Sequence, residues 1–286
     1  MEYFFKYLED KDIYLNDQQK KIVSWNRGQL LVLACPGSGK TTVLNARIAY
    51  MLKIMDINPK NILALTFSKA AATEMNDRFY SIYGDIINTG LSFSTIHSFC
   101  FKILRSYFRK NNIRYELIEG GGTKFDKRII LQEIYKSLNG RKINDDKLEE
   151  LLNAISNIKN TPDDDINYLN YNIPNLENIL KTYSNFKKNN EYGLLLLDFD
   201  DLLLEGYRLL KENKYYIDNC RRYYKYILVD EGHDPSLIQN KIIETIAKEH
   251  KNLFVVCDDD QSIYRFRGAD PEYLLRFKER YPNGEI

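Results

Sequence analysis

Short apolar runs rich in β-branched residues alternate along this chain with longer stretches in which apolar residues recur at helical spacing. The runs at 29–34, 62–67, 226–230 and 253–258 are the predicted strands. Strands that are apolar throughout are typical of parallel sheets covered on both faces, and their alternation with helices is typical of βαβ units. The pattern therefore predicts an α/β fold built on a parallel sheet.

The middle of the chain has a different character, being polar, rich in asparagine and helical in period. Helical periodicity is clearest at 128–138 and 147–158. Strand signals return only after this region, so segments far apart in the sequence are expected to complete the sheet. We predict a helical insertion, 105–190, within one α/β domain formed by 1–104 and 191–286.

A glycine-rich octapeptide, Ala34-Cys35-Pro36-Gly37-Ser38-Gly39-Lys40-Thr41, lies between the first predicted strand and a predicted helix. Such a loop surrounds phosphate groups with backbone N–H groups at a helix N-terminus, where the helix dipole also favours anions. We expect Lys40 to reach the β- and γ-phosphates of ATP and Thr41 to bind the Mg²⁺ of the nucleotide. The loop residues expected to bind nucleotide are Pro36, Gly37, Ser38, Gly39, Lys40, Thr41 and Thr42.

A second candidate for chemistry is the pair of carboxylates in Leu228-Val229-Asp230-Glu231, at the end of an apolar run. Asp230 is expected to hold Mg²⁺ through its water shell, and Glu231 to orient or deprotonate the attacking water. An acidic pair alone is more often a solvated strand end. Open α/β sheets bind ligands at the carboxyl ends of their strands, so the pair and the phosphate loop are expected to form one site.

Further segments match motifs of a known family. They are Leu15-Asn16-Asp17-Gln18-Gln19, 66–75, 94–99, 198–202 and 256–269. Together with the phosphate loop and the acidic pair, they resemble the UvrD/Rep/PcrA group of superfamily 1A DNA helicases, in order and over nearly the whole chain. The resemblance implies a RecA-like phosphate-loop NTPase domain carrying an inserted, mainly helical subdomain, with ATP and Mg²⁺ as cofactors.

The resemblance also implies roles for individual residues. Gln19 stands where the family contacts adenine, and Gln261 where it senses the γ-phosphate, so Lys40, Glu231 and Gln261 are the candidate catalytic residues. The implied partners are single-stranded DNA and junctions of single- and double-stranded DNA, with 3′ to 5′ movement. The candidate DNA-binding residues are Phe67, Lys69, His97, Tyr264, Phe266 and Arg267.

The physics of strand tracking agrees with these roles. A motor that moves along any sequence needs flat side chains on which bases can stack, at ~1–3 kcal/mol per base, and Phe67 and Phe266 offer such faces. Without the family resemblance, a phenylalanine at either position is more often part of a hydrophobic core.

Two positions depart from the family pattern. His233 stands two residues after the acidic pair, where the family usually has glutamine; it could still form a hydrogen bond, but its charge would depend on pH. Cys257 stands where the family usually has glycine, and is expected to be a small residue packed behind the sheet.

A basic and aromatic stretch lies at the predicted entrance to the insertion. It combines Lys102, Arg105, Arg109, Lys110 and Arg114 with Phe101, Tyr107 and Phe108. Such a combination suits a groove for single-stranded nucleic acid. An ordinary solvated helix face explains it equally well.

Composition limits how the protein could bind DNA, metals or membranes but does not indicate a function. Lysines and arginines (41) nearly balance aspartates and glutamates (40), so any DNA binding must come from a local surface. The four cysteines have no metal-ligand or disulfide spacing and are expected to be reduced and mostly buried. No apolar run of membrane-spanning length and no signal peptide occurs, which predicts a cytoplasmic protein without membrane association. The 286-residue fragment by itself is expected to be a monomer.

The resemblance places the γ-phosphate-contacting arginines, the aromatic residue that stacks under adenine and the remaining helicase motifs in a second motor lobe after residue 286. We therefore expect this chain to be the N-terminal portion of a longer enzyme and nearly inactive alone, because an arginine supplied across an interface can contribute ~10³–10⁵ in rate. Two alternatives stay open: the motor part of a helicase-nuclease, and a regulatory module that binds ATP and DNA without moving.

Overall fold

The computed structural model describes residues 1–87, 90–91, 93–120, 125–161, 171–258 and 276–286. The chain divides into two compact units, one formed by 1–98 and 210–286 and the other by 99–209. The second unit extends further in both directions than the predicted insertion, 105–190, whose limits stay a prediction. A polar segment is thus inserted into a domain built from both ends of the chain.

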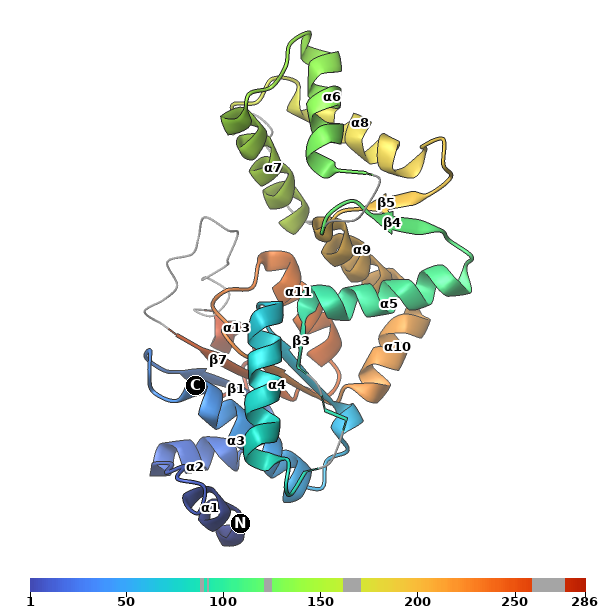
Figure 1. The fold of residues 1–286 in the computed structure, drawn as a ribbon. Coiled ribbons are helices and arrows are strands. Elements are labelled where there is room, and N and C mark those ends of the chain that lie inside the picture. The colour runs from blue at the N-terminus through green and yellow to red at the C-terminus, as the bar shows by residue number, and fades with distance from the viewer. Residues whose placement is uncertain (88–89, 92, 121–124, 162–170, 259–275) are drawn as a thin grey trace. The chain divides into compact units, whose positions relative to one another are not determined.

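The first unit contains a five-stranded parallel sheet (Figure 1). Its order is β1 (Gln29–Leu33), β7 (Leu253–Cys257), β6 (Tyr226–Val229), β2 (Ile62–Thr66) and β3 (Phe93–Thr95). The four predicted strands are present, each ending one residue earlier than expected, and the α/β fold class is confirmed. Strand β3 was not predicted, because its three residues include two polar ones.

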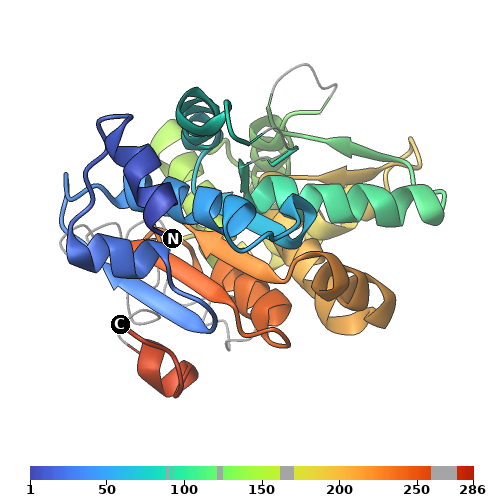
Figure 2. The ribbon, with the colours of Figure 1, turned by 90° about the horizontal axis from the view of Figure 1, so that it is seen from below.

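Helices cover both faces of this sheet, as Figure 2 also shows. The helices in the described part of the first unit are α1 (Glu2–Glu9), α2 (Asp17–Val23), α3 (Lys40–Lys53), η1 (Pro59–Asn61), α4 (Lys69–Tyr83), α10 (Lys214–Tyr223), α11 (Leu237–Ala247) and α13 (Phe277–Arg280). None of the helices in the described part of the chain is long and apolar enough to cross a bilayer.

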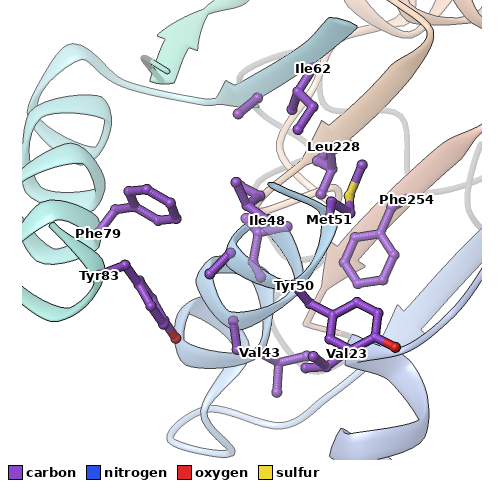
Figure 3. Close-up of a cluster of buried hydrophobic side chains, with 14 of the residues drawn as sticks. Val23, Val43, Ile48, Tyr50, Met51, Ile62, Phe79, Tyr83, Leu228 and Phe254 are labelled. Carbon is purple, nitrogen blue, oxygen red and sulfur yellow. The ribbon is translucent and has the colours of Figure 1, made fainter. Parts of the chain in front are cut away.

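Helix α3 is the centre of the hydrophobic core on one face of the sheet (Figure 3). Its residues 43–51 are all buried, which explains why its helical pattern is visible in the sequence. Val43 and Ile48 pack in the same cluster as Phe79 of α4 and the strand residues Leu228 and Phe254. The helix that follows the phosphate loop is therefore fixed to the sheet over most of its length.

Helix α11 packs against β6 on the opposite face. Ser236 and Gln239 form a capping box at its start, and Ile238, Ile242 and Ile246 are fully buried along one side. A serine followed three positions later by glutamine, before an apolar run, is a common start signal for a helix. Consequently the segment between β6 and α11, which follows the acidic pair, is anchored at both ends.

The second unit is mainly helical. It contains most of α5 (Ile96–Lys110), β4 (Tyr115–Leu117), α6 (Lys127–Asn139), α7 (Asp145–Asn160), α8 (Leu176–Lys188), β5 (Leu195–Leu197) and most of α9 (Phe199–Glu212). Helices α6 and α7 confirm the two predicted helices. The parallel pair β4–β5 was not predicted, since neither strand is longer than three residues.

A cluster of buried charges ties the helices of the second unit to the end of β5. The fully buried Asp198 accepts hydrogen bonds from Lys159 Nζ at 2.6 and 2.8 Å, from Lys187 Nζ at 3.2 Å and from the hydroxyl of Tyr183 at 2.8 Å. Lys159 also contacts Asp201 at 2.8 Å, and Lys187 forms an ion pair with the same carboxylate. The three side chains that meet Asp198 come from α7 and α8.

A third lysine joins this cluster of charges. Lys127 Nζ from α6 lies 3.1 Å from Glu119, 3.2 Å from Asp200 and 3.9 Å from Asp198. Burial alone would raise the pKa of Asp198, but Lys159, Lys187 and Lys127 hold it well below its ordinary value. The carboxylate is therefore ionised, and its charge holds three helices together.

Candidate functional site

The phosphate loop connects β1 to α3 at the carboxyl edge of the sheet. Gly37 and Gly39 have φ angles of +75° and +85°, which glycine adopts without strain. Gly39 is the N-cap of α3, so the first backbone N–H groups of this helix have no intrahelical partner and point out of its N-terminus. This arrangement can bind a phosphate anion, as the sequence predicts.

Gln19 lies beside this loop. Its Nε2 donates to the carbonyl oxygen of Ser38 at 3.1 Å, and its Oε1 accepts from the N–H of Asn16 at 2.9 Å in a capping box at the start of α2. The structure therefore brings the candidate adenine-binding residue and the phosphate loop together. Both ends of the amide are engaged by the protein itself, and its contact with adenine stays a prediction.

Lys40 is held by an ion pair that the sequence did not predict. Its Nζ lies 2.6 Å from Oδ2 of Asp258, which is fully buried, and donates to the carbonyl oxygen of Ala34 at 3.3 Å. Asp258 directly follows β7, the neighbour of β1 in the sheet. The pairing depends on this strand order, which no local sequence signal specifies.

Thr41 and Thr42, which follow Lys40, and the acidic pair also lie at the carboxyl edge of the sheet. Thr41 lies half-buried in the first turn of α3, and Thr42 Oγ1 accepts a hydrogen bond from Arg78 at 3.0 Å. Asp230 and Glu231 directly follow β6, and Glu231 has a φ of +50°, which is uncommon for a side chain of this size. Loop, lysine and carboxylates thus come from the same edge of adjacent strands.

Asp230 has a carboxylate oxygen that could bind a cation. Its carboxylate is buried, and Oδ1 has no hydrogen-bond partner among the described residues. Burial, with a smaller contribution from the charge of Glu231, raises the pKa of Asp230 to about 6. A divalent cation would supply the missing partner and favour the ionised form, so the donor set fits Mg²⁺.

Thr66 adds a polar group that was not singled out in the sequence. It ends β2, the neighbour of β6, and the N–H of Asp230 donates to the carbonyl oxygen of Leu65 just before it. The buried Thr66 Oγ1 also has no hydrogen-bond partner in the described part of the chain. A threonine in an apolar strand gives no sequence signal for a site.

The segment after the acidic pair packs tightly on β7. The N–H of Gly232 donates to the carbonyl oxygen of Val256 at 2.8 Å, and a Cβ at this position would overlap Cγ1 of Val255. Cys257 is fully buried in β7, as expected for a small residue packed in the sheet. The segment that carries His233, where the chain departs from the family pattern, is therefore packed closely against β7.

The candidate DNA-binding residues are only partly described. Phe67, which follows β2, is 41% exposed, Lys69 is the exposed first residue of α4, and His97 is half-buried in the first turn of α5. Gln261, the candidate γ-phosphate sensor, and Tyr264, Phe266 and Arg267 lie outside the described residues. An exposed phenylalanine beside the carboxyl edge is available for stacking, in contrast to the core position that phenylalanine more often takes.

The basic and aromatic stretch divides between surface and core. Arg105 and Arg109 are exposed on α5, whereas Phe108 is buried with Leu104, and Phe101 packs against the same cluster. The guanidinium of Arg105 lies 5.8 Å from the ring centre of Phe101. Because these aromatic rings pack inside the second unit, the stretch is better explained as an amphipathic helix with an exposed basic face and a buried aromatic face.

The sequence matches a described family over nearly all of its length. The family described as UvrD/REP helicase N-terminal domain matches residues 15–282. The chain belongs to this family. This UvrD/REP domain is 35% identical over 277 residues to a protein named ATP-dependent DNA helicase PcrA from Staphylococcus epidermidis RP62A, covering 95% of the chain and 37% of that relative.

A second relative gives the same picture. The UvrD/REP domain is 35% identical over 275 residues to ATP-dependent DNA helicase PcrA from Staphylococcus aureus Mu50, covering 94% of the chain and 36% of the relative. The domain therefore spans a little over a third of the length of these relatives. Their names describe the whole proteins as helicases.

Proposed function

We propose that this chain is the ATP-binding N-terminal part of a DNA helicase motor, which binds ATP with Mg²⁺ and single-stranded DNA. The observation that carries the proposal is the meeting of three groups at one edge of the sheet. The phosphate loop leaves β1, Lys40 is paired with Asp258 after β7, and Asp230 and Glu231 follow β6. Membership of the UvrD/REP family supports the same activity.

The roles of the residues follow from their positions. Backbone N–H groups at the start of α3 would bind the phosphates, and Lys40 would neutralise charge on the terminal ones. Thr41 and Asp230 would hold Mg²⁺, which supplies positive charge that stabilises the phosphate oxygens during transfer. Glu231 Oε2, buried and without a hydrogen-bond partner among the described groups, can accept a proton from a water placed for attack.

Hydrolysis by these 286 residues alone is proposed to be slow. They correspond to 37% of the length of the PcrA relative, and the resemblance assigns the arginines that contact the γ-phosphate to a different lobe. Such an arginine can contribute ~10³–10⁵ in rate. We expect nucleotide binding without robust turnover, and rapid DNA-stimulated hydrolysis by this chain would contradict that expectation.

Nucleotide binding is tested by replacing Lys40. We expect Lys40→Ala to weaken binding of Mg²⁺-ADP by at least about tenfold, since it removes the side-chain cation expected to contact the phosphates. Isothermal titration of the 286-residue chain measures the dissociation constant. Lys53→Ala, an exposed lysine at the other end of α3, is the matched control and should bind as the unmodified chain does. Equal affinities for both variants would exclude the proposed site.

DNA binding is tested at Phe67. Loss of one stacked base contact is worth ~1–3 kcal/mol, so Phe67→Ala should weaken binding of a fluorescently labelled oligothymidylate by about five- to 150-fold. Tyr3→Ala removes another exposed aromatic ring of the first unit, away from the carboxyl edge, and should leave binding unchanged. Fluorescence anisotropy at low salt measures both. An unchanged affinity for Phe67→Ala would remove the stacking role.

A further inference from the structure

His233 occupies a buried position between the acidic pair and the end of β7. Its side chain is almost fully enclosed, and its residue is 4% exposed. Nδ1 lies 3.3 Å from the backbone nitrogen of Asp258, and 3.6 Å from Oε2 of Glu231, while Nε2 lies 3.5 Å from Oδ1 of Asp234. The imidazole therefore touches three carboxylate-bearing residues, and the shortest of these contacts is the hydrogen bond from the backbone N–H of Asp258.

The donor in that hydrogen bond fixes the tautomer of the ring. The N–H of Asp258 donates, so Nδ1 must accept and the ring proton must lie on Nε2, directed toward Asp234. In this tautomer Nδ1 has no hydrogen for Glu231. Oε2 of Glu231 accordingly stays without a hydrogen-bond partner among the described groups, which leaves it able to accept from a water.

The hydrogen bond from Asp258 to His233 adds a second tie between this segment and β7. Gly232 donates to Val256, and two residues along the strand Asp258 donates to His233. Together they extend the contact between the chain after β6 and the end of β7 beyond the last paired residues, Val229 and Val255. The backbone of Asp258 is therefore held by β7, which it directly follows, and by the hydrogen bond to His233.

Asp258 in turn places Lys40. The Lys40 ammonium has three N–H donors, of which one meets Asp258 Oδ2 at 2.6 Å and another the carbonyl of Ala34 at 3.3 Å. The third has no acceptor among the described residues and is left for a phosphate oxygen. A long lysine side chain loses considerable rotamer freedom when it binds a ligand, so fixing it beforehand favours binding.

We propose that His233 is a positioning residue for the phosphate-binding lysine: by accepting the N–H of Asp258 it fixes the carboxylate that holds Lys40 in place. The inference rests on the proposed nucleotide site and adds to it a residue at which this chain departs from the family pattern. Glutamine, the usual family residue, has a side-chain oxygen that can accept the same N–H.

The test compares His233→Leu, which removes the acceptor at similar volume, with His233→Gln, which keeps one. We expect His233→Leu to weaken Mg²⁺-ADP binding by about fivefold, the effect of one net hydrogen bond, and His233→Gln to restore most of it. His250→Leu is the matched control, since His250 also makes a short hydrogen bond, 2.6 Å to the carbonyl of Arg221, but at the opposite edge of the sheet.

Amide hydrogen exchange at Asp258 provides a readout that does not involve nucleotide. Exchange should be faster in His233→Leu than in the unmodified chain, and protection should return in His233→Gln. Unchanged nucleotide affinity or unchanged Asp258 exchange in His233→Leu would overturn the proposal while leaving the proposed function intact. Tighter nucleotide binding in this variant would also overturn it, because it would mean that Asp258 competes with phosphate for Lys40. Failure of the unmodified chain to bind Mg²⁺-ADP would overturn both.

Discussion

Replacing Asp198 with asparagine is expected to lower the free energy of unfolding of the second unit by about 3–5 kcal/mol, the usual effect of removing one partner from a buried charge cluster. The carboxylate meets Lys159, Lys187 and Tyr183 at hydrogen-bond distance, and an amide cannot balance the lysine charges. Because the pKa of Asp198 is lowered, its stabilising charge is present at every pH above the ordinary value of an aspartate and is lost only in acid. The full effect should therefore appear at pH 7.

Urea denaturation separates this effect from a change in the first unit. Trp25 is the only tryptophan of the chain and lies in the first unit, so its fluorescence reports on that unit, whereas circular dichroism reports on the helices of both. Asp198→Asn should shift the circular dichroism transition more than the fluorescence transition. Glu177→Gln, which removes the exposed ion pair with Lys181, is the control and should change neither. A variant as stable as the unmodified chain would mean that the cluster holds the helices weakly.

Replacing Asp230 with asparagine is expected to have the opposite effect on stability. Its pKa is raised to about 6, so the folded state binds this proton more tightly than the unfolded state does. The contribution of Asp230 to stability is thus most favourable below the ordinary aspartate pKa and is lost as pH rises through about 4 to 6. At pH 7 the buried charge destabilises the chain by about 2–3 kcal/mol, which asparagine would remove.

The same substitution should impair the proposed function. The amide of Asp230→Asn would offer Mg²⁺ a neutral oxygen, so Mg²⁺-dependent nucleotide binding is expected to weaken while the nucleotide-free chain becomes more stable. Denaturation followed by Trp25 fluorescence at pH 4.5 and pH 7.5 measures the difference between variant and unmodified chain, which should grow with pH. Asp218→Asn on the exposed side of α10 is the control. A destabilised variant at pH 7.5 would show that Asp230 has a partner that compensates its charge.

The sequence predicted the parts of the fold that have a continuous local pattern. Strands β1, β2, β6 and β7 are four or five residues long and almost wholly apolar, and α3 is buried over consecutive residues, so their signals are strong. Strands β3 and β4 contain polar residues, and β5, although it consists of leucines, is only three residues long. They are extended because a neighbouring strand pairs with them, which is a property of the tertiary structure.

The site was predictable as a set of residues and not as a set of contacts. The phosphate loop and the acidic pair have distinctive local sequences, whereas the ion pair of Lys40 with Asp258 joins residues that meet only because β7 lies next to β1. His233 was recognised as a departure from the family pattern, but its acceptor role depends on the backbone of a distant strand. The lysines around Asp198 have no sequence signal of their burial, since helical periodicity does not tell which polar side chains are buried.

The position of β1 has a consequence for biosynthesis. One edge of β1 pairs with β7, and its other edge exchanges hydrogen bonds with Glu285, so both neighbours of this early strand come from the last part of the 286 residues. While a ribosome makes the chain at roughly 5–20 residues per second, the apolar segment 29–33 waits on the order of 10–50 s for its partners. Strand β1 thus cannot complete its pairing until β7 and Glu285 have been synthesised, and chaperone protection of this apolar segment during that interval would matter more than for proteins whose sheets assemble in sequence order.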